Sequence, residues 1–351
     1  MLSLVMIVKN EEHVIERSLD SALPHVDTWC IVDTGSTDST IEKIRATAKK
    51  HGKEGVLHER PWVNFGHNRT ELLELARQTE AAWFFMMDAD DILESELAKP
   101  FEQQFGSEDA YTMTFKRGEL TYRRPAVFNT KPWVFRGALH EYAHLDGSVL
   151  GHIEKGWVDA RVEGARSKNP NKYRDDALAL ETEFKERPDP RTAFYCAQSW
   201  RDSGNGEKAT EWYLRRAAMG GWNQEIYVSY LNLVRLTPDV SLKLNYAYLS
   251  LEACPRLEAA HAALEYFRQR NTWSSRAYYL GLEAVKIAKK GKDDLFAEPV
   301  ECKFYDEFSI HAFYTGHDDI AVLYGMKAYF LAPLDERARI LNNVKFSVNR
   351  T

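Results

Sequence analysis

Short apolar runs alternate with amphipathic segments in the first 90 residues, and this alternation most constrains the fold. Short, continuously apolar runs are typical of strands that are buried on both faces of a sheet. We expect such strands at residues 2–8, 29–32, 55–58 and 81–85. Helical patterns lie between them at residues 14–23, 41–50 and 70–78. Strands that alternate with helices predict a parallel, doubly wound sheet.

Polar clusters follow three of these strands, at residues 9–12, 33–38 and 88–91. In doubly wound sheets, ligands bind at the carboxyl ends of the strands. Since parallel strands end at the same edge of the sheet, the three clusters should meet there. The sequence therefore predicts one polar site at this edge.

The most acidic of these clusters is Asp88-Ala89-Asp90-Asp91, which follows an apolar strand. Side chains alternate along a strand, so Asp88 and Asp90 should point the same way. Two hard oxygen donors suit Mg²⁺ or Mn²⁺, with substrate phosphates completing the coordination shell. Three acids in a row are costly without a nearby cation. The alternative is that these acids only cap a helix after Ile92.

The second half of the chain is helical in pattern from Tyr173 onward, and it contains an internal repeat. One unit is marked by Ala197, Trp200, Gly204, Ala209 and Tyr213, and another by Gly316, Ala321, Ala328 and Pro333. The two glycines lie a little over three periods of about 34 residues apart. This spacing resembles tetratricopeptide repeats, in which helix pairs stack because each pair leaves an apolar face uncovered.

Four motifs in the first half carry a second resemblance. They are Val5-Met6-Ile7-Val8-Lys9-Asn10-Glu11-Glu12, Val32-Asp33-Thr34-Gly35-Ser36-Thr37-Asp38-Ser39-Thr40, Gly66-His67-Asn68-Arg69 and Asp88-Ala89-Asp90-Asp91. In this order and spacing, over roughly the first 165 residues, they resemble family-2 glycosyltransferases of the GT-A fold. The Asp-Thr-Gly-Ser form is similar to the branch that carries a helical-repeat domain, including sublancin-type peptide S-glycosyltransferases. Thr34 departs from many relatives, which carry a second Asp at this position.

The two resemblances together predict an α/β plus all-α protein. We expect a GT-A domain, which is Rossmann-like, over residues 1–165, a linker over residues 166–172 and a helical tetratricopeptide-like α-solenoid over residues 173–351. The family resemblance implies a nucleotide-sugar donor, with UDP as the default nucleotide, a Mn²⁺ or Mg²⁺ ion and an inverting displacement at the anomeric carbon.

The resemblance also implies roles for individual residues at the strand ends. Asp90 would bind the metal directly, with Asp91 as a supporting or alternative ligand, and Asp88 would contact the ribose or a metal-bound water. Asp33 would bind the base or ribose, although an N-cap or turn role is an alternative. Further donor contacts are expected from Val8, Asn10, Glu12 and Ala89. Glu12 has the alternative of an exposed acid at a helix start.

Asn68 and Arg69 begin the helix expected over residues 70–78. Asn68 with Glu71 three residues later fits a capping box, so we expect Asn68 to cap this helix. Arg69 would project from a helix N-terminus, where backbone N–H groups already favour anions. It is expected either to bind the donor diphosphate or to form a surface salt bridge.

Residues 131–142 form the next group, in which Gly137 precedes His140 and Glu141. By resemblance, His140 supplies a third protein ligand, and an imidazole would favour Mn²⁺ over Mg²⁺. The alternative is a histidine that only satisfies its own hydrogen bonds. Inverting transfer needs a carboxylate base near the acceptor; Glu141 is the first candidate, with Asp159 and Glu163 behind it. Glu163 stands where many relatives carry a histidine.

Composition bounds the partners and the compartment. The net charge of −6 gives no general nucleic-acid footprint. No run of about 20 apolar residues exists, so no membrane span is expected. The four cysteines are scattered without pairing or metal spacing, which favours a reduced, cytoplasmic protein or, for a viral or phage protein, the host cytoplasm.

The acceptor is less constrained than the donor. A domain of about 165 residues leaves little chain for an acceptor subdomain, so we expect the repeats to help bind a peptide, protein or glycan. Aromatic side chains such as Trp200, Trp212, Trp222, Tyr227 and Tyr230 either line that groove or form the core between helices. The repeats are also a possible homodimer contact.

Two other functions remain open. One is transfer to modified, phage-type DNA bases, for which a basic surface would come from Lys116-Arg117, Arg123-Arg124 and Arg166, Lys168 and Lys172. The other is a nucleotide-binding scaffold in which the transferase domain is degenerate. Donor turnover and salt-dependent DNA binding discriminate among these hypotheses.

Overall fold

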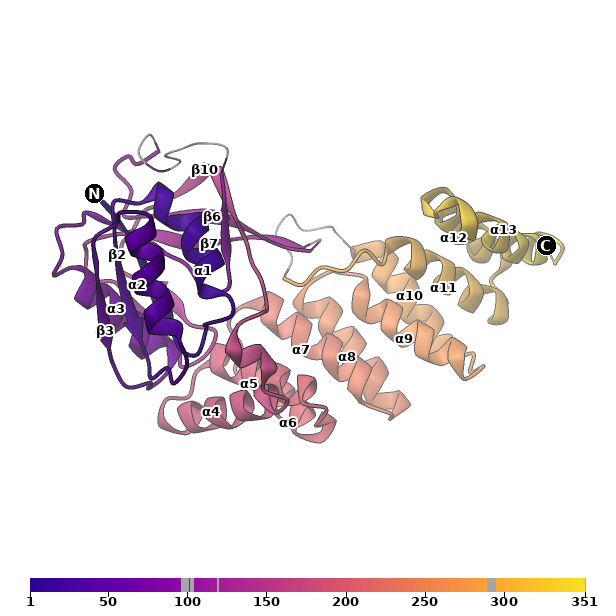
Figure 1. Ribbon diagram of the computed structural model, residues 1–351. Coiled ribbons are helices and arrows are strands. Elements are labelled where there is room, and N and C mark those ends of the chain that lie inside the picture. Colours follow the sequence, from indigo (N-terminus) through magenta and orange to yellow (C-terminus); the bar gives the residue numbers. More distant parts are fainter. Residues whose placement is uncertain (96–100, 102–103, 119, 289–294, 351) are drawn as a thin grey trace. The chain divides into compact units, whose positions relative to one another are not determined.

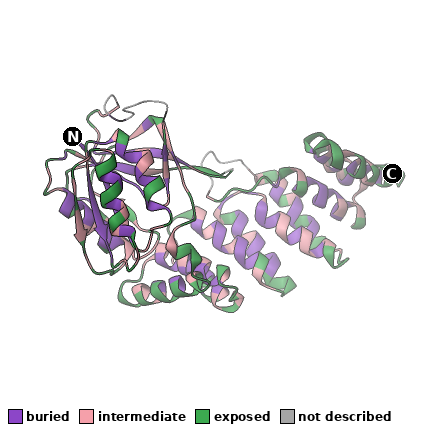
Figure 2. Cartoon of the chain, viewed as in Figure 1, coloured by how far each residue is buried: buried purple, intermediate pink, exposed green. Residues whose placement is uncertain are grey.

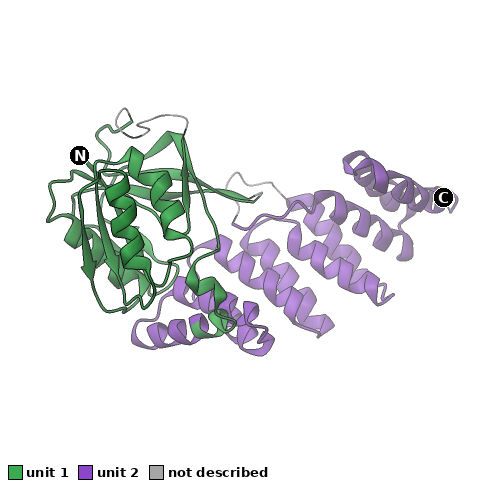
Figure 3. Cartoon of the chain, viewed as in Figure 1, with its two compact units in different colours: residues 1–175 green, residues 176–351 purple. Residues whose placement is uncertain are grey.

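The computed structural model describes residues 1–95, 101, 104–118, 120–288 and 295–350, and Figure 1 shows the order of its helices and strands. Two compact units divide the chain, Met1–Asp175 and Asp176–Thr351 (Figure 3). The first is an α/β unit with a large sheet, and the second is entirely helical in the part that is described. The α/β plus all-α class expected from the sequence is therefore confirmed.

The first half of the large sheet is parallel, as predicted. Its central strand β1 (Leu2–Val8) pairs with β2 (Thr28–Asp33) on one side and β4 (Trp83–Met86) on the other, and β2 pairs with β3 (Gly55–Glu59). Val8 lies opposite Asp33 in this register, so the polar segments after β1 and β2 emerge side by side.

The second half of the sheet is mixed, which corrects the expectation of a wholly parallel sheet. The eight strands have the order β3-β2-β1-β4-β7-β6-β10-β5. Strand β7 (Leu120–Asn129) is antiparallel to β4 and to β6 (Ala110–Arg117), and β10 (Leu150–Asp159) is parallel to β6. Edge strand β5 (Ile92–Glu94) is antiparallel to β10. Strands β6 and β7 form a hairpin, so no crossover helix is needed to join them.

A separate two-stranded ribbon consists of β8 (Val134–Arg136) and β9 (Tyr142–His144). The segment between these strands carries His140 and Glu141. The close fit of this ribbon against the large sheet's helices is visible at Gly66, where an added Cβ would lie 2.4 Å from the Gly137 carbonyl oxygen. Only glycine leaves room for that approach.

Helices cover both faces of the parallel strands. On one face, α1 (Ile15–Ala22) and α2 (Thr40–Lys50) pack Ile15, Leu19 and Ile44 onto alternate residues of β1. On the other face, α3 (Phe65–Ala76) contributes Leu72 and Leu73 to a second core. Figure 2 shows the buried residues concentrated along the strands between these helices. Burying each such Leu or Ile contributes roughly 1.5–3 kcal/mol.

Helix α3 begins five residues earlier than predicted. Its N-cap is Asn64, whose Oδ1 accepts the His67 N–H at 2.8 Å, so the prediction that Asn68 caps the helix is wrong. Asn68 is buried one turn further on, where its amide bonds to the Val63 N–H and the Pro61 carbonyl. It fixes the extended segment that enters the helix.

The helical unit consists of antiparallel helix pairs after α4 (Lys172–Glu186). Its remaining helices are α5 (Pro190–Asp202), α6 (Gly206–Ala218), α7 (Asn223–Leu236), α8 (Val240–Ala253), α9 (Glu258–Gln269), α10 (Ser275–Ile287), α11 (Glu301–Tyr314), α12 (Asp318–Leu331) and α13 (Leu334–Val348). Helices α5 and α6 pack together, as do α7 and α8, α9 and α10, and α11 and α12. Gly204 and Gly316 turn the chain within the first and last of these pairs, each at φ +83°.

The aromatic residues of the repeats are mostly core residues. Trp200, Trp212 and Tyr227 are buried between helices, whereas Trp222 is about half exposed. The four cysteines are free thiols, and three of them are buried. Within the described residues, no helix is long and apolar enough to cross a membrane.

Candidate active site

The carboxyl end of β2 presents Asp33, which is 2% exposed. One oxygen, Oδ1, accepts the N–H groups of Gly35 and Ser36 at 2.9 and 2.8 Å. The other, Oδ2, is buried and has no hydrogen-bond partner in the described part of the chain. Asp33 thus shapes the turn and still has one oxygen to offer to a ligand, so the two roles weighed for it are compatible.

The residues after β1 face the turn after β2. Asn10 has φ +57°, and its side chain accepts the Thr37 N–H at 2.8 Å. Glu12 accepts the Ser39 N–H at 3.0 Å, which places its carboxylate at the start of α2. The Val8 carbonyl accepts both the N–H and the hydroxyl of Thr34. Thr34 therefore joins β1 to β2 at the place where an Asp stands in many relatives.

Asp88 lies between two arginines after β4. Its Oδ1 is 2.6 Å from Arg69 Nη2, and its Oδ2 is 2.9 Å from Arg124 Nη2. Burial alone would raise the pKa of Asp88, but the two guanidinium groups outweigh it and hold this pKa well below its usual range. Arg69, 5% exposed, is also 2.7 Å from Glu141 Oε1, so its ion pairs are buried in the site and do not lie on the surface.

A backbone segment covers the remaining acids. We call residues 161–165, which follow β10, the amide strap. Asp90 Oδ2 accepts the N–H groups of Glu163 and Gly164, both at 2.9 Å. Asp91 Oδ1 accepts the Arg161 N–H at 3.2 Å, and Glu11 accepts the Ala165 N–H at 3.1 Å. Four backbone N–H groups of one short segment therefore donate to three carboxylates that follow β1 and β4.

The strap is also held by side chains of α1 and the residues before it. Arg17 Nη2 lies 2.5 Å from Glu163 Oε2, and His13 Nε2 lies 2.7 Å from the Glu163 carbonyl oxygen. Arg161 pairs with Asp159 at 2.8 Å within its own segment. Glu163 and Asp159 are thus engaged with arginines in this state.

The acidic site carries more negative charge than its surroundings neutralise. Burial, and then the charge of Asp88, raises the pKa of Asp91 to about 8. Asp91 Oδ2 is buried without a hydrogen-bond partner in the structure, although Arg124 Nη2 lies 3.5 Å away. Burial is also the main cause that raises the pKa of Glu11 to about 7, with a further contribution from Asp90. A cation bound nearby would stabilise the ionised forms of Asp91 and Glu11.

The donor set suits a metal ion that needs few protein ligands. No group of three acidic, histidine or cysteine side chains among the described residues can hold a metal. Asp90 and Asp91 are adjacent hard donors, however, and Mg²⁺ is often bound by one or two carboxylates that are completed by substrate phosphates and water. His140 is exposed at φ +54° and does not join the aspartates in such a group.

Three features of this site lay outside the sequence prediction. In the sequence, Glu11 is an ordinary acid after β1, and Arg124 is part of a basic surface. Pairing of β7 with β4 would have placed Arg124 near Asp88, but the sequence analysis did not predict that pairing. Arg124 also lies over the Phe115 ring, 4.2 Å from its centroid. The amide strap has no residue signal, because backbone N–H groups are the same in almost every residue type.

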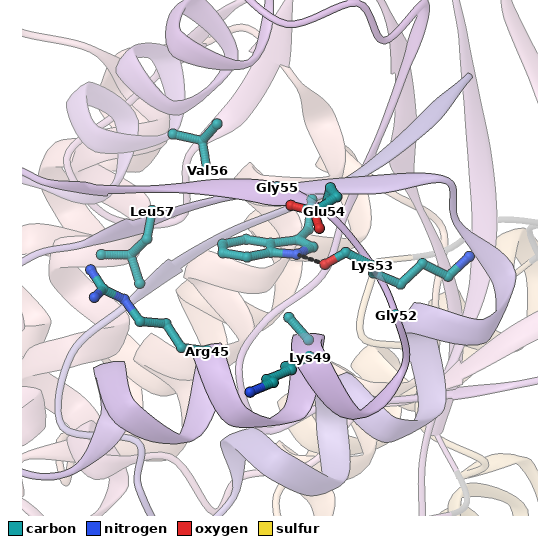
Figure 4. A pocket seen from close by; sticks show the side chains of 10 residues that line it. Arg45, Lys49, Gly52, Lys53, Glu54, Gly55, Val56 and Leu57 are labelled. Carbon is teal, nitrogen blue, oxygen red and sulfur yellow. Dashed lines mark hydrogen bonds between the residues drawn. The ribbon is translucent and has the colours of Figure 1, made fainter.

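A hollow of about 440 Å³ lies at the other ends of β2 and β3, away from these acids. Figure 4 shows Arg45, Lys49 and Lys53 around it, with the indole of Trp29 donating to the Lys53 carbonyl at 3.1 Å. It is bounded by the amino ends of the strands, whereas the polar clusters lie at their carboxyl ends. It is therefore separate from the acidic site.

Comparison with known proteins finds a family match in the first half of the chain and one curated relative. Residues 3–145 match the family model described as glycosyl transferase family 2. A TPR repeat-containing protein of Synechococcus elongatus is 28% identical over 163 residues, which are 44% of this chain and 38% of that protein. The chain thus matches about two fifths of the length of this curated relative.

Solved structures give similar likenesses. Residues 1–349 of S. aureus TarS in complex with UDP-GlcNAc align over 78% of this chain and 92% of that one, with 14% identity and a TM-score of 0.40. TTC0263, a TPR protein of Thermus thermophilus, aligns over 50% of this chain and 91% of that one, with 17% identity and a TM-score of 0.30. The similarity to sublancin-type enzymes stays a prediction. Residues 3–145 of this chain thus match the glycosyl transferase family 2 model, and the helix pairs that follow have the arrangement expected of tetratricopeptide-like repeats.

Proposed function

We propose that this protein is a metal-dependent, inverting glycosyltransferase that moves a sugar from a nucleotide-sugar donor, with UDP as the expected nucleotide, to a peptide, protein or glycan. The observation that carries the proposal is the group of carboxylates at the ends of β1, β2 and β4, with Arg69 of α3 and Arg124 of β7 beside them, in the region that matches family 2. The carboxylates outnumber the arginines there, and a bound cation would offset this excess of negative charge.

The donor would be held by groups that already have unused capacity. Asp33 Oδ2 can accept a hydrogen bond from the base or ribose, because it has no partner in the described residues. Arg69 and Arg124 can each turn from Asp88 toward the diphosphate, since guanidinium groups bind phosphate as readily as carboxylate. Val8, Asn10, Glu12 and Ala89 remain expected contacts of the nucleotide.

Asp90 and Asp91 are the residues that would hold Mn²⁺ or Mg²⁺, with His140 as a further candidate ligand. When bound, such an ion neutralises negative charge on the leaving nucleoside diphosphate. The amide strap occupies one oxygen of each aspartate, Asp90 Oδ2 and Asp91 Oδ1, and so leaves the other oxygen of each for an ion. The strap and the ion would therefore share the same carboxylates.

Glu141 remains the first candidate for the base that takes the acceptor proton, with Asp159 and Glu163 behind it. Its carboxylate is paired with Arg69 in this state. A donor diphosphate that takes Arg69 would release Glu141, so donor binding would switch the base on. Asp159 and Glu163 would first have to leave Arg161 and Arg17.

The net charge of −6 disfavours transfer to DNA bases, and Arg124, one of the seven residues of the suggested basic surface, is engaged with Asp88. Turnover of the donor distinguishes a glycosyltransferase from a scaffold that only binds nucleotide.

The test is hydrolysis of a panel of nucleotide sugars with Mn²⁺, Mg²⁺ or EDTA, with Asp90→Asn as the site variant. The matched control is Asp146→Asn, since the Asp146 side chain is 97% exposed in a loop.

We expect one donor to be cleaved only with metal, with activity lost in Asp90→Asn and kept in Asp146→Asn. Nucleotide binding without turnover, even with peptide, protein and glycan acceptors added, would support the scaffold hypothesis. Failure to bind any nucleotide would refute the proposal.

A further inference from the structure

The helical unit contains a groove of its own. A hollow of about 830 Å³ is lined by residues of α7, α8, α9, α11 and α13. A smaller hollow of about 240 Å³ shares Arg235 and Glu298 with it and extends to α5. We call the two together the helical groove. Its lining comes mainly from the first helix of each successive pair.

The floor of the helical groove contains a buried carboxylate with an unused oxygen. Asp306 is 7% exposed, and its Oδ2 accepts from Arg339 Nη2 at 2.8 Å. Its Oδ1 is buried without a hydrogen-bond partner in the described part of the unit. Leaving a buried acceptor of this kind unsatisfied is energetically unfavourable, so a donor that reaches it from the groove is favoured.

The charge of the lining is acidic. Among the described residues of the larger hollow there are six carboxylates and four lysine or arginine side chains. Two of the arginines are already paired, Arg235 with Glu298 and Arg339 with Asp306, both at 2.8 Å. Glu265 and Asp335 form no ion pair with any described residue. Polyanions such as nucleic acid or phosphate polymers are therefore repelled, and ammonium or guanidinium groups are attracted.

The length of the groove suits a chain more than a small molecule. Helices α7, α9, α11 and α13 pack on one another in succession. Packed helices lie about 8–10 Å apart, so three steps span roughly 25–30 Å. An extended polypeptide covers that distance with about 8 residues.

We propose that the helical groove binds an extended, basic segment of the acceptor polypeptide, with a lysine or arginine side chain bound at Asp306 Oδ1 and the neighbouring Glu265. This inference rests on the proposed function and narrows its acceptor from peptide, protein or glycan to a polypeptide. A neutral glycan offers no cation for these carboxylates.

The test is fluorescence anisotropy with the full-length protein and labelled peptides of about ten residues. One peptide carries lysines spaced along a glycine–serine sequence, and its counterparts carry glutamate or acetyl-lysine at the same places. The variants are Asp306→Asn and Glu265→Gln, and circular dichroism reports whether each still folds. The control is Glu207→Gln, on the exposed surface of α6 outside the groove.

We expect the lysine peptide alone to bind, with affinity reduced at least fivefold in Glu265→Gln and in Asp306→Asn and kept in the control. Equal binding of the glutamate or acetyl-lysine peptide would refute the inference. An equal loss in Glu207→Gln would also refute it, because the attraction would then come from net charge. The peptide-binding assay contains no nucleotide sugar, so its result does not depend on catalysis. Failure of the proposed function would be detected separately, as absence of donor cleavage by the wild-type protein.

Discussion

Gly66 is the point where one methyl group should disturb the candidate active site most. In Gly66→Ala, the new Cβ would lie 2.4 Å from the Gly137 carbonyl oxygen and 3.0 Å from that of Phe135. Ordinary contacts of this kind begin near 3.4 Å, so the 134–138 segment or α3 must move by about 1 Å. Helix α3 is fixed by its Asn64 cap and the Arg69 ion pairs, so we expect the segment to move.

The cost follows from the contacts that this movement breaks. The Phe65 N–H donates to the Ala138 carbonyl at 3.1 Å, and the Phe135 N–H donates to the Thr70 hydroxyl at 2.9 Å. Overpacking costs about 1–3 kcal/mol, and a weakened hydrogen bond about 1 kcal/mol more. We therefore expect a local loss of about 2–4 kcal/mol, and a looser contact between Glu141 and Arg69.

Hydrogen–deuterium exchange followed by mass spectrometry suits a protein of two units, for which a single unfolding free energy is not defined. Peptides over residues 134–144 should exchange at least about 30-fold faster in Gly66→Ala, which corresponds to 2 kcal/mol. The control is Gly206→Ala at the start of α6, where the added Cβ would meet only Leu236 at 3.7 Å. That variant should be neutral or slightly stabilising.

Unchanged exchange in residues 134–144 of the Gly66→Ala protein would refute the close approach of α3 and this segment. Faster exchange spread evenly over the first unit would refute the local mechanism, because the methyl group would then lower global stability.

Three further predictions concern buried charge. Arg69→Met should lower the local stability of α3 by about 3 kcal/mol in hydrogen–deuterium exchange, because it leaves Glu141 without its arginine and Asp88 with Arg124 alone, whereas Arg77→Met after the same helix should cost under about 1 kcal/mol. Mn²⁺ with UDP should slow amide exchange in residues 161–165, because an ion on the other carboxylate oxygens would fix the aspartates to which the strap donates; faster exchange with nucleotide bound would contradict this sharing. Burial, with a smaller effect of Arg270, lowers the pKa of Lys243 to about 8 from 10.5, although its ammonium lies 4.2 Å from the Tyr266 ring centroid. Between pH 8 and 10.5 the unfolded chain then binds more protons than the folded chain, so the stability of the wild-type protein should rise with pH in this window. Lys243→Met should be more stable than the wild type by about 2 kcal/mol at pH 7, and this difference should shrink toward pH 10.

The parallel half of the sheet could be predicted because each strand is marked by its own apolar run in the sequence. Strand β1 has the predicted bounds, residues 2–8, since its apolar run is continuous and ends at a charged residue. The mixed half was missed because β7 pairs with β4, β10 with β6 and β5 with β10 over long sequence distances, and only the β6–β7 hairpin is local. Helix α3 was started too late because Asn68 and Glu71 imitate a capping box, while the true cap, Asn64, precedes an aromatic and a glycine.

The same distinction holds within the candidate site. Asp33, Asp88 and Asp90 were found because strand ends gather whatever follows them. Their partners were not, because Arg124 reaches Asp88 through β-sheet pairing and the strap reaches Asp90 from more than 70 residues away through its backbone. Whether Asp90, Asp91 and His140 bind a metal is still a prediction.

The position of the amide strap also sets how far the first unit can be shortened. The family match ends at residue 145, and a protein truncated there would keep every sequence motif of the candidate site except Asp159 and Glu163. It would lose β10, however, and so expose the open edges of β6 and β5, which invite aggregation. It would also remove the backbone donors of Glu11, Asp90 and Asp91. The shortest well-behaved form of this unit should therefore extend beyond Ala165.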